Sequence, residues 1–320
     1  MILLITGGAG FIGSNFIRML LNSGSDYDIV NLDALTYAGN LNNLKDFEKS
    51  PHYTFIHGDI CNRELINTIL TQNKIDTIIH FAAESHVDRS VADSSAFIRT
   101  NILGTHTLLE CARRQGISRF IHISTDEVYG STVKGSFTES DILSPSSPYS
   151  ASKAGSDLLA CSYYTTYNLP VIVTRCTNNF GPYQYPEKLI PLFITNLLSG
   201  KKVPLYGSGM NIRDWIHVND HCRAIRFILK KGIPGEIYNI GSGNERTNIE
   251  ITEKILELLK KDSSKIEYVT DRPGHDLRYS LDFSKILSLG WRPEYSFDDA
   301  ISDTVEWYVR NEWWWRPLKR

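Results

Sequence analysis

Short apolar runs alternate with helical patterns along the first half of the chain. The runs are rich in Ile, Val and Phe and are bounded by turn or polar residues, which predicts strands at 2–6, 29–33, 53–57, 77–81, 120–124 and 171–175. Segments of helical length and period lie between them, for example at 12–21 and 105–115. Strands that alternate with helices form a parallel sheet with helices on both faces, so the pattern predicts a doubly wound α/β fold.

The regular alternation weakens after about residue 176. Proline and glycine cluster at 181–186 and 204–209, and shorter helices are predicted at 220–231, 249–259 and 298–310. We therefore expect a smaller α/β lobe that caps the strand ends. The predicted domains are residues 1–177, with later segments near 210–240 packing back on them, and residues 178–320.

Composition narrows the possible partners and the compartment. The 320 residues carry a net charge of −2, which gives no electrostatic reason to expect binding to nucleic acid or to a membrane surface. The apolar start of the chain lacks a basic flank, and no run approaches the roughly 18 apolar residues of a membrane span. The five cysteines show no metal spacing, so we expect reduced thiols in a cytoplasmic protein.

A glycine-rich turn, Thr6-Gly7-Gly8-Ala9-Gly10-Phe11-Ile12-Gly13, follows the first predicted strand at once. It matches G-x-G-x-x-G, or G-x-x-G-x-x-G when counted from its first glycine, and a helix is predicted directly after it. Small residues let the backbone approach a pyrophosphate, and the start of a helix offers free N–H groups to it. The strand–turn–helix context makes the fold Rossmann-like and predicts a dinucleotide site.

Acidic residues that follow the next two strands suggest which dinucleotide binds. Asp33 closes the second predicted strand, where its carboxylate can accept hydrogen bonds from the adenosine ribose hydroxyls. Because a carboxylate repels a 2′-phosphate and residues 34–36 contain no arginine, the cofactor should be NAD rather than NADP. Asp59, after the third strand, either reaches the adenine edge or caps the next helix.

Two further motifs predict the chemistry. Tyr149 and Lys153 lie four residues apart on a predicted helix, hence on one face, where the ammonium should lower the tyrosine pKa and make the phenol a base. Thr125-Asp126-Glu127 ends the fifth predicted strand. Alcohol oxidation needs no carboxylate pair, whereas removal of water from the oxidised product needs an acid and a base. The two motifs together predict a lyase.

The chain resembles the extended short-chain dehydrogenases/reductases of the NAD-dependent epimerase/dehydratase family, and more narrowly the dTDP-glucose 4,6-dehydratase family. The stretches that carry the resemblance span nearly the whole chain and are residues 6–13, 32–40, 80–90, 124–130, 148–153, 178–191 and 213–215. Sugar-nucleotide epimerases of the same superfamily lack the Asp126-Glu127 pair. Residues 113–119 are shorter than in some relatives, which should shorten a surface loop.

The resemblance implies conversion of dTDP-glucose to dTDP-4-keto-6-deoxyglucose and water in deoxysugar biosynthesis. Tyr149 would take the proton of the C4 hydroxyl while hydride passes to NAD, with Lys153 on the nicotinamide ribose and Thr125 on the C4 oxygen. Glu127 would then take the C5 proton, and a protonated Asp126 would protonate the departing C6 hydroxyl. Hydride would return to C6, so NAD should stay bound from one cycle to the next.

The resemblance also implies the residues around each ligand and a homodimer that pairs through the helix bearing Tyr149 and its neighbour. Residues 1–177 would bind NAD, and residues 178–320 would mainly bind the nucleotide sugar. Expected at the cofactor are Gly7, Gly10, Phe11, Ile12, Gly13, Asp33, Ala34, Leu35, Thr36, Asp59, Ile60, Phe81, Ala82, Ala83, Ser85, Thr100, Tyr149, Lys153 and Asn179. Expected at the substrate are Ser85, Thr125, Asn178, Glu187, Lys188, Leu189, Arg213, Asn248, Arg272 and His275.

Two alternative functions stay open at this point. One is a dehydratase or 4-epimerase of another nucleotide sugar, and the other is a non-catalytic NAD-binding regulator. His217 and His221 have no third ligand at metal spacing, so no metal is expected. The run Trp313-Trp314-Trp315 should pack against the second lobe. The pattern does not specify the final deoxysugar or its acceptor.

Overall fold

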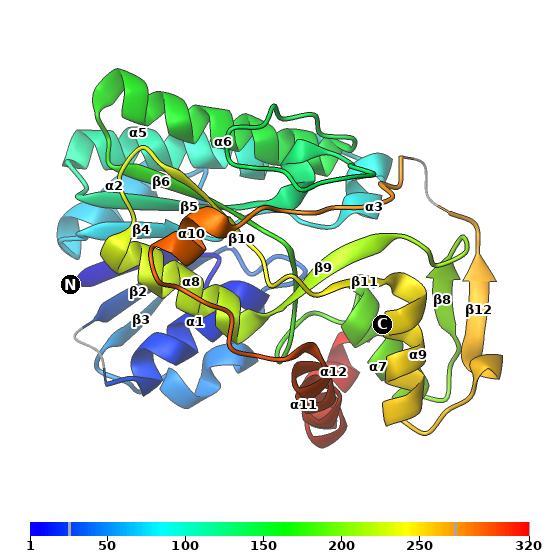
Figure 1. Ribbon diagram of the computed structural model, residues 1–320. Coiled ribbons are helices and arrows are strands. Elements are labelled where there is room, and N and C mark those ends of the chain that lie inside the picture. The colour runs from blue at the N-terminus through cyan, green and yellow to red at the C-terminus, as the bar shows by residue number, and fades with distance from the viewer. Residues whose placement is uncertain (25–26, 272–273, 320) are drawn as a thin grey trace.

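A seven-stranded parallel sheet forms the centre of the computed structural model, which describes residues 1–24, 27–271 and 274–319 (Figure 1). Its strands are β1 (Ile2–Thr6), β2 (Asp28–Asp33), β3 (Tyr53–His57), β4 (Thr77–His80), β5 (Arg119–Thr125), β6 (Val171–Cys176) and β10 (Ile237–Ile240). Their spatial order is β3-β2-β1-β4-β5-β6-β10. Strand order reverses between β1 and β4, and this is where doubly wound sheets open a crevice for ligands.

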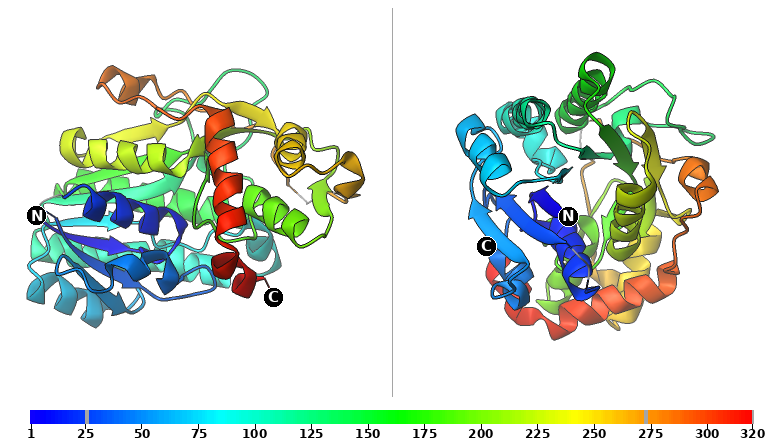
Figure 2. Two further views of the ribbon diagram at one scale, coloured as in Figure 1. Left: turned by 90° about the horizontal axis from the view of Figure 1, so that it is seen from below. Right: turned by 90° about the vertical axis from the view of Figure 1, so that its left-hand side faces the viewer.

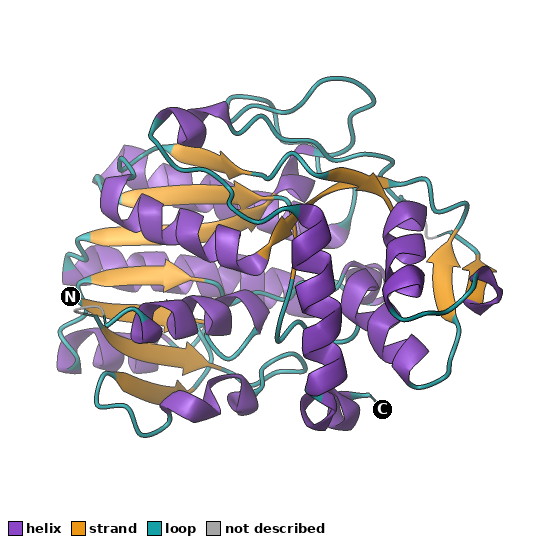
Figure 3. Ribbon diagram, turned by 60° about the horizontal axis from the view of Figure 1, so that its bottom comes forward, coloured by secondary structure: helices purple, strands orange, loops and turns teal. Residues whose placement is uncertain are grey.

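Helices cover both faces of this sheet, because its strands alternate their buried side chains between two cores (Figure 3). Leu3 and Ile5 face one core and Leu4 the other, and all three are fully buried. Helices α1 (Phe11–Asn22) and α8 (Val218–Lys231) pack together on the first face. Helices α2 (Arg63–Gln72), α5 (Thr105–Gln115) and α6 (Pro148–Tyr167) cover the second.

The remaining elements form the smaller lobe and the connections. The lobe holds a three-stranded sheet of β7 (Asn178–Phe180), β9 (Ile212–His217) and β11 (Glu245–Thr247), a pair of β8 (Val203–Tyr206) and β12 (Ile266–Val269), and helices α7 (Leu189–Leu198), α9 (Asn248–Leu258), α11 (Phe297–Arg310) and α12 (Glu312–Trp315). Connecting helices are η1 (Leu41–Phe47), α3 (Val87–Ala92), α4 (Ser95–Phe97), η2 (Ile98–Gly104), η3 (Asp126–Tyr129), η4 (Ser263–Lys265), α10 (Ser284–Ser288) and η5 (Arg316–Leu318).

The predicted fold class, a doubly wound parallel sheet with a smaller α/β lobe, is confirmed. All six predicted strands form, with ends shifted by at most one residue. The sequence did not predict β10, because Ile-Tyr-Asn-Ile is too short a run to distinguish from a loop. It pairs in parallel with β6 and so becomes the edge of the main sheet, after the chain has already entered the second lobe.

The start of helix α6 is fixed by its sequence. Ser147 and Ser150 exchange side-chain and backbone hydrogen bonds in a capping box, and Pro148 occupies the first helical turn. Asn168 ends the helix in the left-handed conformation. The cap therefore fixes which residues of α6 face the strands, and it places Tyr149 and Lys153 on the buried side.

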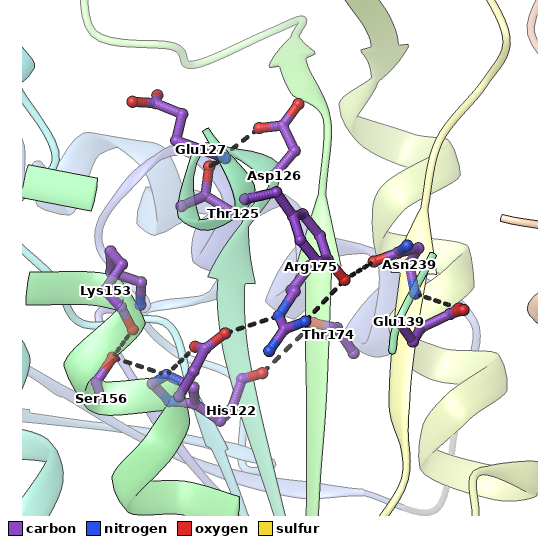
Figure 4. Close-up of polar contacts among 12 residues, drawn as sticks. His122, Thr125, Asp126, Glu127, Glu139, Lys153, Ser156, Thr174, Arg175 and Asn239 are labelled. Atoms are coloured by element: carbon purple, nitrogen blue, oxygen red, sulfur yellow. Dashed lines mark hydrogen bonds and ion pairs between the residues drawn. The ribbon is translucent and has the colours of Figure 1, made fainter. Parts of the chain in front are cut away.

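A buried polar network fastens α6 to the strands below the carboxyl end of the sheet (Figure 4). Asp157 accepts a hydrogen bond from Arg175 of β6 at 2.9 Å and lies 3.3 Å from His122 of β5. Arg175 also donates to the Tyr129 hydroxyl at 2.7 Å, which in turn donates to Asn239 of β10 at 2.9 Å. The network thus joins three neighbouring strands to one helix.

No helix in the described part of the chain is long and apolar enough to cross a bilayer.

We expect Asp157→Ala to destabilise the protein by about 3–5 kcal/mol, because it leaves the Arg175 guanidinium buried without its partner. The matched control is Glu306→Ala, which removes an exposed carboxylate from its ion pair with Arg310 and should cost under about 1 kcal/mol. Urea unfolding of both variants measures the difference. Equal losses would show that the buried pair does not carry this stability.

Candidate active site

A cleft of about 580 Å³ runs along the carboxyl ends of the central strands and is closed on its other side by residues of the second lobe. The glycine-rich turn, the ends of β2 and β5, and the start of α6 line it from the main sheet. Trp215 of β9 and Asn179 of β7 line it from the lobe. The cleft therefore lies where the reversal of strand order predicts a ligand site.

Glycines of the turn allow a backbone path that other residues cannot follow. Gly7 has φ +74°, and a Cβ there would lie 2.5 Å from the backbone nitrogen of Ala82. A Cβ on Gly13 would lie 2.5 Å from the carbonyl oxygen of Gly7. Helix α1 begins at Phe11 without a side-chain cap, so its first N–H groups are available to an anion in the cleft.

Asp33 lies at the end of β2, where the sequence predicted a ribose-binding carboxylate. Its two oxygens accept hydrogen bonds from the backbone of Ala9 at 2.9 Å and of Leu35 at 2.8 Å, which fix the carboxylate at the cleft wall. Burial raises its pKa. Farther along the wall, Asp59 pairs with Arg99 at 2.8 Å.

The cleft brings together nearly all the residues that the sequence predicted for the cofactor. Lining it are Gly7, Gly10, Phe11, Ile12, Gly13, Asp33, Ala34, Thr36, Asp59, Ile60, Phe81, Ala82, Ala83, Ser85, Thr100, Tyr149, Lys153 and Asn179. Leu35 is not among the described lining residues. Its backbone N–H donates a hydrogen bond to the Asp33 carboxylate, which does line the cleft.

Several buried polar atoms of the cleft wall have no hydrogen-bond partner among the described residues. They are the Ser124 hydroxyl, Asp126 Oδ2, the Thr177 hydroxyl, Asn178 Oδ1, Gln184 Oε1, Trp215 Nε1 and His221 Nε2. Buried polar atoms of this kind cost free energy unless they are paired. A polar ligand such as NAD with a sugar nucleotide would pair them, so the residues present fit that ligand class.

Three of the predicted catalytic residues converge below the tip of β5. Thr125 ends β5 and lies near enough to the Tyr149 phenol to lower its pKa, and Tyr149 is 8% exposed. Lys153 Nζ, one helical turn farther along α6, donates to the carbonyl oxygen of Ile123 at 2.8 Å. Figure 4 shows Lys153 on α6 beside the strand that carries Thr125. Backbone packing of α6 against β5 thus sets the distance between phenol and threonine.

The pKa of Tyr149 differs from the sequence-based expectation. Burial raises it well above its usual value, the nearby carboxyl groups of Glu127 and Asp126 raise it further, and Thr125 lowers it only in part. Burial also lowers the pKa of Lys153, to about 8. The expected lowering by Lys153 is therefore wrong for this state, because the ammonium is bound to a backbone carbonyl and the nearest charges are carboxylates.

The carboxylate pair follows Thr125 directly. Thr125 caps η3, donating its hydroxyl to Asp126 Oδ1 at 3.1 Å and accepting the Glu127 N–H at 3.2 Å. In Figure 4 the carboxyl groups of Asp126 and Glu127 point away from each other. Burial, together with the charge of Glu127, raises the pKa of Asp126 to about 8. Asp126 is therefore mostly protonated at neutral pH and can serve as an acid.

The residues predicted for the substrate divide into two groups. Ser85, Thr125, Asn178, Glu187, Lys188 and Leu189 line the cleft. Lys188 Nζ donates to the carbonyl oxygen of Ser85 at 2.7 Å, which ties the second lobe to the main sheet at this point.

The other group is not among the described lining residues of the cleft, although Arg213 is near enough to Asp126 to lower the pKa of that carboxyl. Arg213 donates to the carbonyl oxygen of Asp276 at 2.9 Å and lies over the Tyr279 ring at 4.1 Å. Asn248 begins α9, and His275 pairs with Asp271 at 2.6 Å. Arg272 lies outside the described residues.

Sequence reasoning missed several lining residues. His221 and Gln184 both contact Asn179. His221 Nδ1 lies 2.8 Å from Asn179 Oδ1, and the Gln184 side-chain amide donates to the backbone carbonyl of Asn179 at 2.9 Å. Burial lowers the pKa of His221 to about 3, so it is neutral. No motif marks His221, because it reaches the cleft only through the packing of α8. Gln184 lies within the stretch 178–191 that carries the family resemblance, but it was not among the predicted site residues. Among the described residues, no group of three or more potential ligands could hold a metal.

The whole chain matches known proteins. The family model described as GDP-mannose 4,6 dehydratase matches residues 4–304. A dTDP-glucose 4,6-dehydratase of Streptomyces niveus is 51% identical over 99% of this chain and 95% of its own, and the low-salt glycan biosynthesis protein Agl12 of Haloferax volcanii is 52% identical over 97% and 99%.

Among solved structures, the dTDP-glucose 4,6-dehydratase DesIV of Streptomyces venezuelae, with NAD and TYD bound, superposes with a TM-score of 0.98 at 55% identity and covers 100% of both chains. The similarity thus extends over both lobes and over every motif that lines the cleft. The chain belongs to the family of the GDP-mannose 4,6 dehydratase model and, within it, to the dTDP-glucose 4,6-dehydratases.

Proposed function

We propose that this chain is an NAD-dependent dTDP-glucose 4,6-dehydratase that forms dTDP-4-keto-6-deoxyglucose and water for deoxysugar biosynthesis. The observation that carries the proposal is the carboxylate pair Asp126-Glu127 beside Thr125 and Tyr149 in the cleft. Relatives with this name, similar along the full chain, support it.

In the proposed reaction the residues around β5 act on successive atoms of the sugar. Tyr149 accepts the proton of the C4 hydroxyl, and Thr125 hydrogen-bonds the same oxygen. The C4 ketone acidifies the C5 proton, which Glu127 removes. Asp126, kept protonated by its burial, gives its proton to the departing C6 hydroxyl. One neutral carboxyl and one base thereby remove one water.

NAD, when bound, supplies the reversible two-electron oxidation and reduction that makes C4 a ketone for the duration of the elimination. We propose that the turn at Gly7–Gly13 holds its pyrophosphate, that Asp33 holds the adenosine ribose and that Lys153 holds the nicotinamide ribose. Residues 1–177 would accordingly bind NAD, while residues 178–320 would mainly bind the nucleotide sugar. β10 and α8 pack back on the main sheet from within that second range.

Arg213, Asn248 and His275 stay part of the proposal as ligands of the nucleotide portion of the substrate. Arg213 lies on β9 and Asn248 begins α9, both in the second lobe, which supports a nucleotide that extends from the cleft towards that lobe. The five cysteines are free thiols, which a reducing compartment favours, and we propose that the enzyme works in the cytoplasm.

Incubation with dTDP-glucose and mass spectrometry of the sugar nucleotide tests the activity. We expect loss of one water without added reductant, and deuterium from heavy water at C5. Glu127→Gln is the matched variant and should lose the incorporation at C5. A mixture of C4 epimers at unchanged mass would instead indicate an epimerase. Turnover of UDP- or GDP-sugars alone would show that the substrate carries a nucleobase other than thymine.

The raised pKa of Asp126 predicts a loss of kcat at alkaline pH. The acid form is present below about pH 8 and disappears as the pH rises through that value. Asp126→Asn should lower kcat by about 10²–10⁴-fold and abolish this alkaline limb, because an amide cannot act as the acid. Burial also gives Lys153 a pKa of about 8, so a limb that persists in Asp126→Asn would belong to Lys153. Rate profiles from pH 6 to 10 separate the two.

We also propose a homodimer that pairs through α6 and its neighbouring helix. Exposed apolar residues support this surface, with Leu158 of α6 62% exposed and Leu103 and Ile98 of the adjacent η2 about half exposed. Leu158→Asp should give a monomer in size-exclusion chromatography with light scattering. Ile233→Asp, at an equally exposed position of the loop after α8, should leave the mass unchanged. A wild-type monomer would contradict the proposal.

A further inference from the structure

The tryptophans at 313–315 have no part in the proposed reaction, and they differ in how far they are exposed to solvent. Trp313 is 56% exposed, whereas Trp314 and Trp315 are 2% and 1% exposed. Both buried indoles donate a hydrogen bond, but to different parts of the molecule. Trp315 Nε1 donates to the carbonyl oxygen of Tyr308 at 2.7 Å, within the C-terminal segment itself.

Trp314 instead reaches across to the main sheet domain. Its Nε1 donates to Asn43 Oδ1 at 2.8 Å, a residue 271 positions earlier in the chain. Its ring packs against Tyr183 and Trp307, with ring centroids 5.7 and 5.1 Å apart. Figure 2 shows α11 and the C-terminal segment lying between the sheet domain and the smaller lobe. Trp314 therefore bridges the two.

Asn43 passes this contact on to the glycine-rich turn. It is 1% exposed, and its Nδ2 donates to the carbonyl oxygen of Ala9 at 2.9 Å. Ala9 lies within the turn, and its own N–H donates to Asp33 at 2.9 Å. An unbroken chain of hydrogen bonds thus runs from the Trp314 indole through the Asn43 amide and the turn to the carboxylate of Asp33.

The Asn43 amide is held in one orientation from both sides. The Trp314 indole N–H can only donate and therefore faces the amide oxygen, while the Ala9 carbonyl can only accept and faces the amide nitrogen. If the indole N–H were absent, the buried Oδ1 would lose this partner, and the amide would be held through its nitrogen alone. The Asn40 N–H is the other described donor to the Ala9 carbonyl, at 3.0 Å.

The same aromatic group also supports the opposite wall of the cleft. Tyr308, in ring contact with Trp314, donates its hydroxyl to the carbonyl oxygen of Gln184 at 2.5 Å. The Gln184 amide donates to the carbonyl oxygen of Asn179 at 2.9 Å, and both residues line the cleft. The C-terminal helices therefore contact one wall of the cleft directly, at Gln184, and the glycine-rich turn of the other wall through Asn43.

We infer that Trp314 is a positioning residue of the dinucleotide site, which acts through Asn43 to hold the glycine-rich turn in its binding conformation. The inference rests on the NAD site of the proposed function but not on the identity of the sugar substrate. Trp314 does not contact the cofactor. A turn that is already held in its binding conformation loses less conformational entropy when NAD binds, so NAD is bound more tightly. We expect this contribution to appear as slower release of bound NAD.

The test compares NAD release from purified holoenzyme variants that each lose one indole N–H but keep an aromatic ring. Trp314→Phe should release NAD about three- to tenfold faster than wild type, as expected for one buried hydrogen bond. Trp315→Phe loses an equally buried hydrogen bond, so it should lower Tm by about as much as Trp314→Phe does. It should nevertheless leave the rate of NAD release within twofold of wild type. Trp313→Phe, at the exposed position, should change neither.

A second variant tests the route through Asn43. Asn43→Leu is close to the amide in shape and removes both the contact with Trp314 and the contact with Ala9. It should speed NAD release at least as much as Trp314→Phe, and the double variant should be no faster than Asn43→Leu alone. Additive effects would mean that the two residues act independently and would overturn the proposed route.

The remaining outcomes separate this inference from the proposed function. Unchanged NAD release in Trp314→Phe, or equal acceleration in Trp315→Phe, overturns the positioning role and leaves the proposed function intact. Wild-type protein that carries no NAD, and binds none when it is added, overturns the proposed cofactor and with it the inference. At saturating NAD, kcat of Trp314→Phe should match wild type, because no reacting atom is touched.

Discussion

The buried ion pair between Asp157 and Arg175 is the contact on which the arrangement of the active site depends. It fixes helix α6 against β5 and β6, and α6 carries the phenol and the ammonium while β5 ends in the threonine and the carboxylates. Relative to the sheet, a helix could otherwise slide or rotate about its axis. A charged pair that is almost completely buried favours one register, so the acid–base groups are positioned by a contact some distance below them.

Burial then gives the groups of the cleft their different protonation states. Desolvation favours the neutral form of every ionisable side chain, whichever its charge. It keeps Asp126 protonated and His221 neutral, and it brings the pKa of Lys153 down to about 8. The same environment opposes ionisation of Tyr149, since two carboxyl groups lie close to it. The burial that keeps Asp126 protonated thus also disfavours the phenolate of Tyr149 as long as no ligand is bound.

Local sequence patterns predicted six strands of the main sheet and the cleft residues expected at the cofactor, because each of these features is encoded by a short contiguous stretch of residues. The turn at Gly7–Gly13, Asp33 and the helix bearing Tyr149 each carry their signal within a few positions. Strand β10 and the lining residue His221 could not be found in this way, since both are placed by contacts between distant segments. The pKa of Tyr149 was predicted in the wrong direction because sequence spacing shows which charge is near but not how buried the group is.

The late position of β10 has a consequence for how the protein forms during synthesis. β6 is buried along its whole length by β5 and β10, yet residues 177–236 must be made between Cys176 and the first residue of β10. A nascent chain that has completed only the first six strands presents β6 as an open, apolar edge, the kind of edge that pairs with other chains. The main sheet can therefore be completed only after β7, α7, β8 and β9 of the second lobe have been made, although β11, α9, β12, α11 and α12 are still to follow.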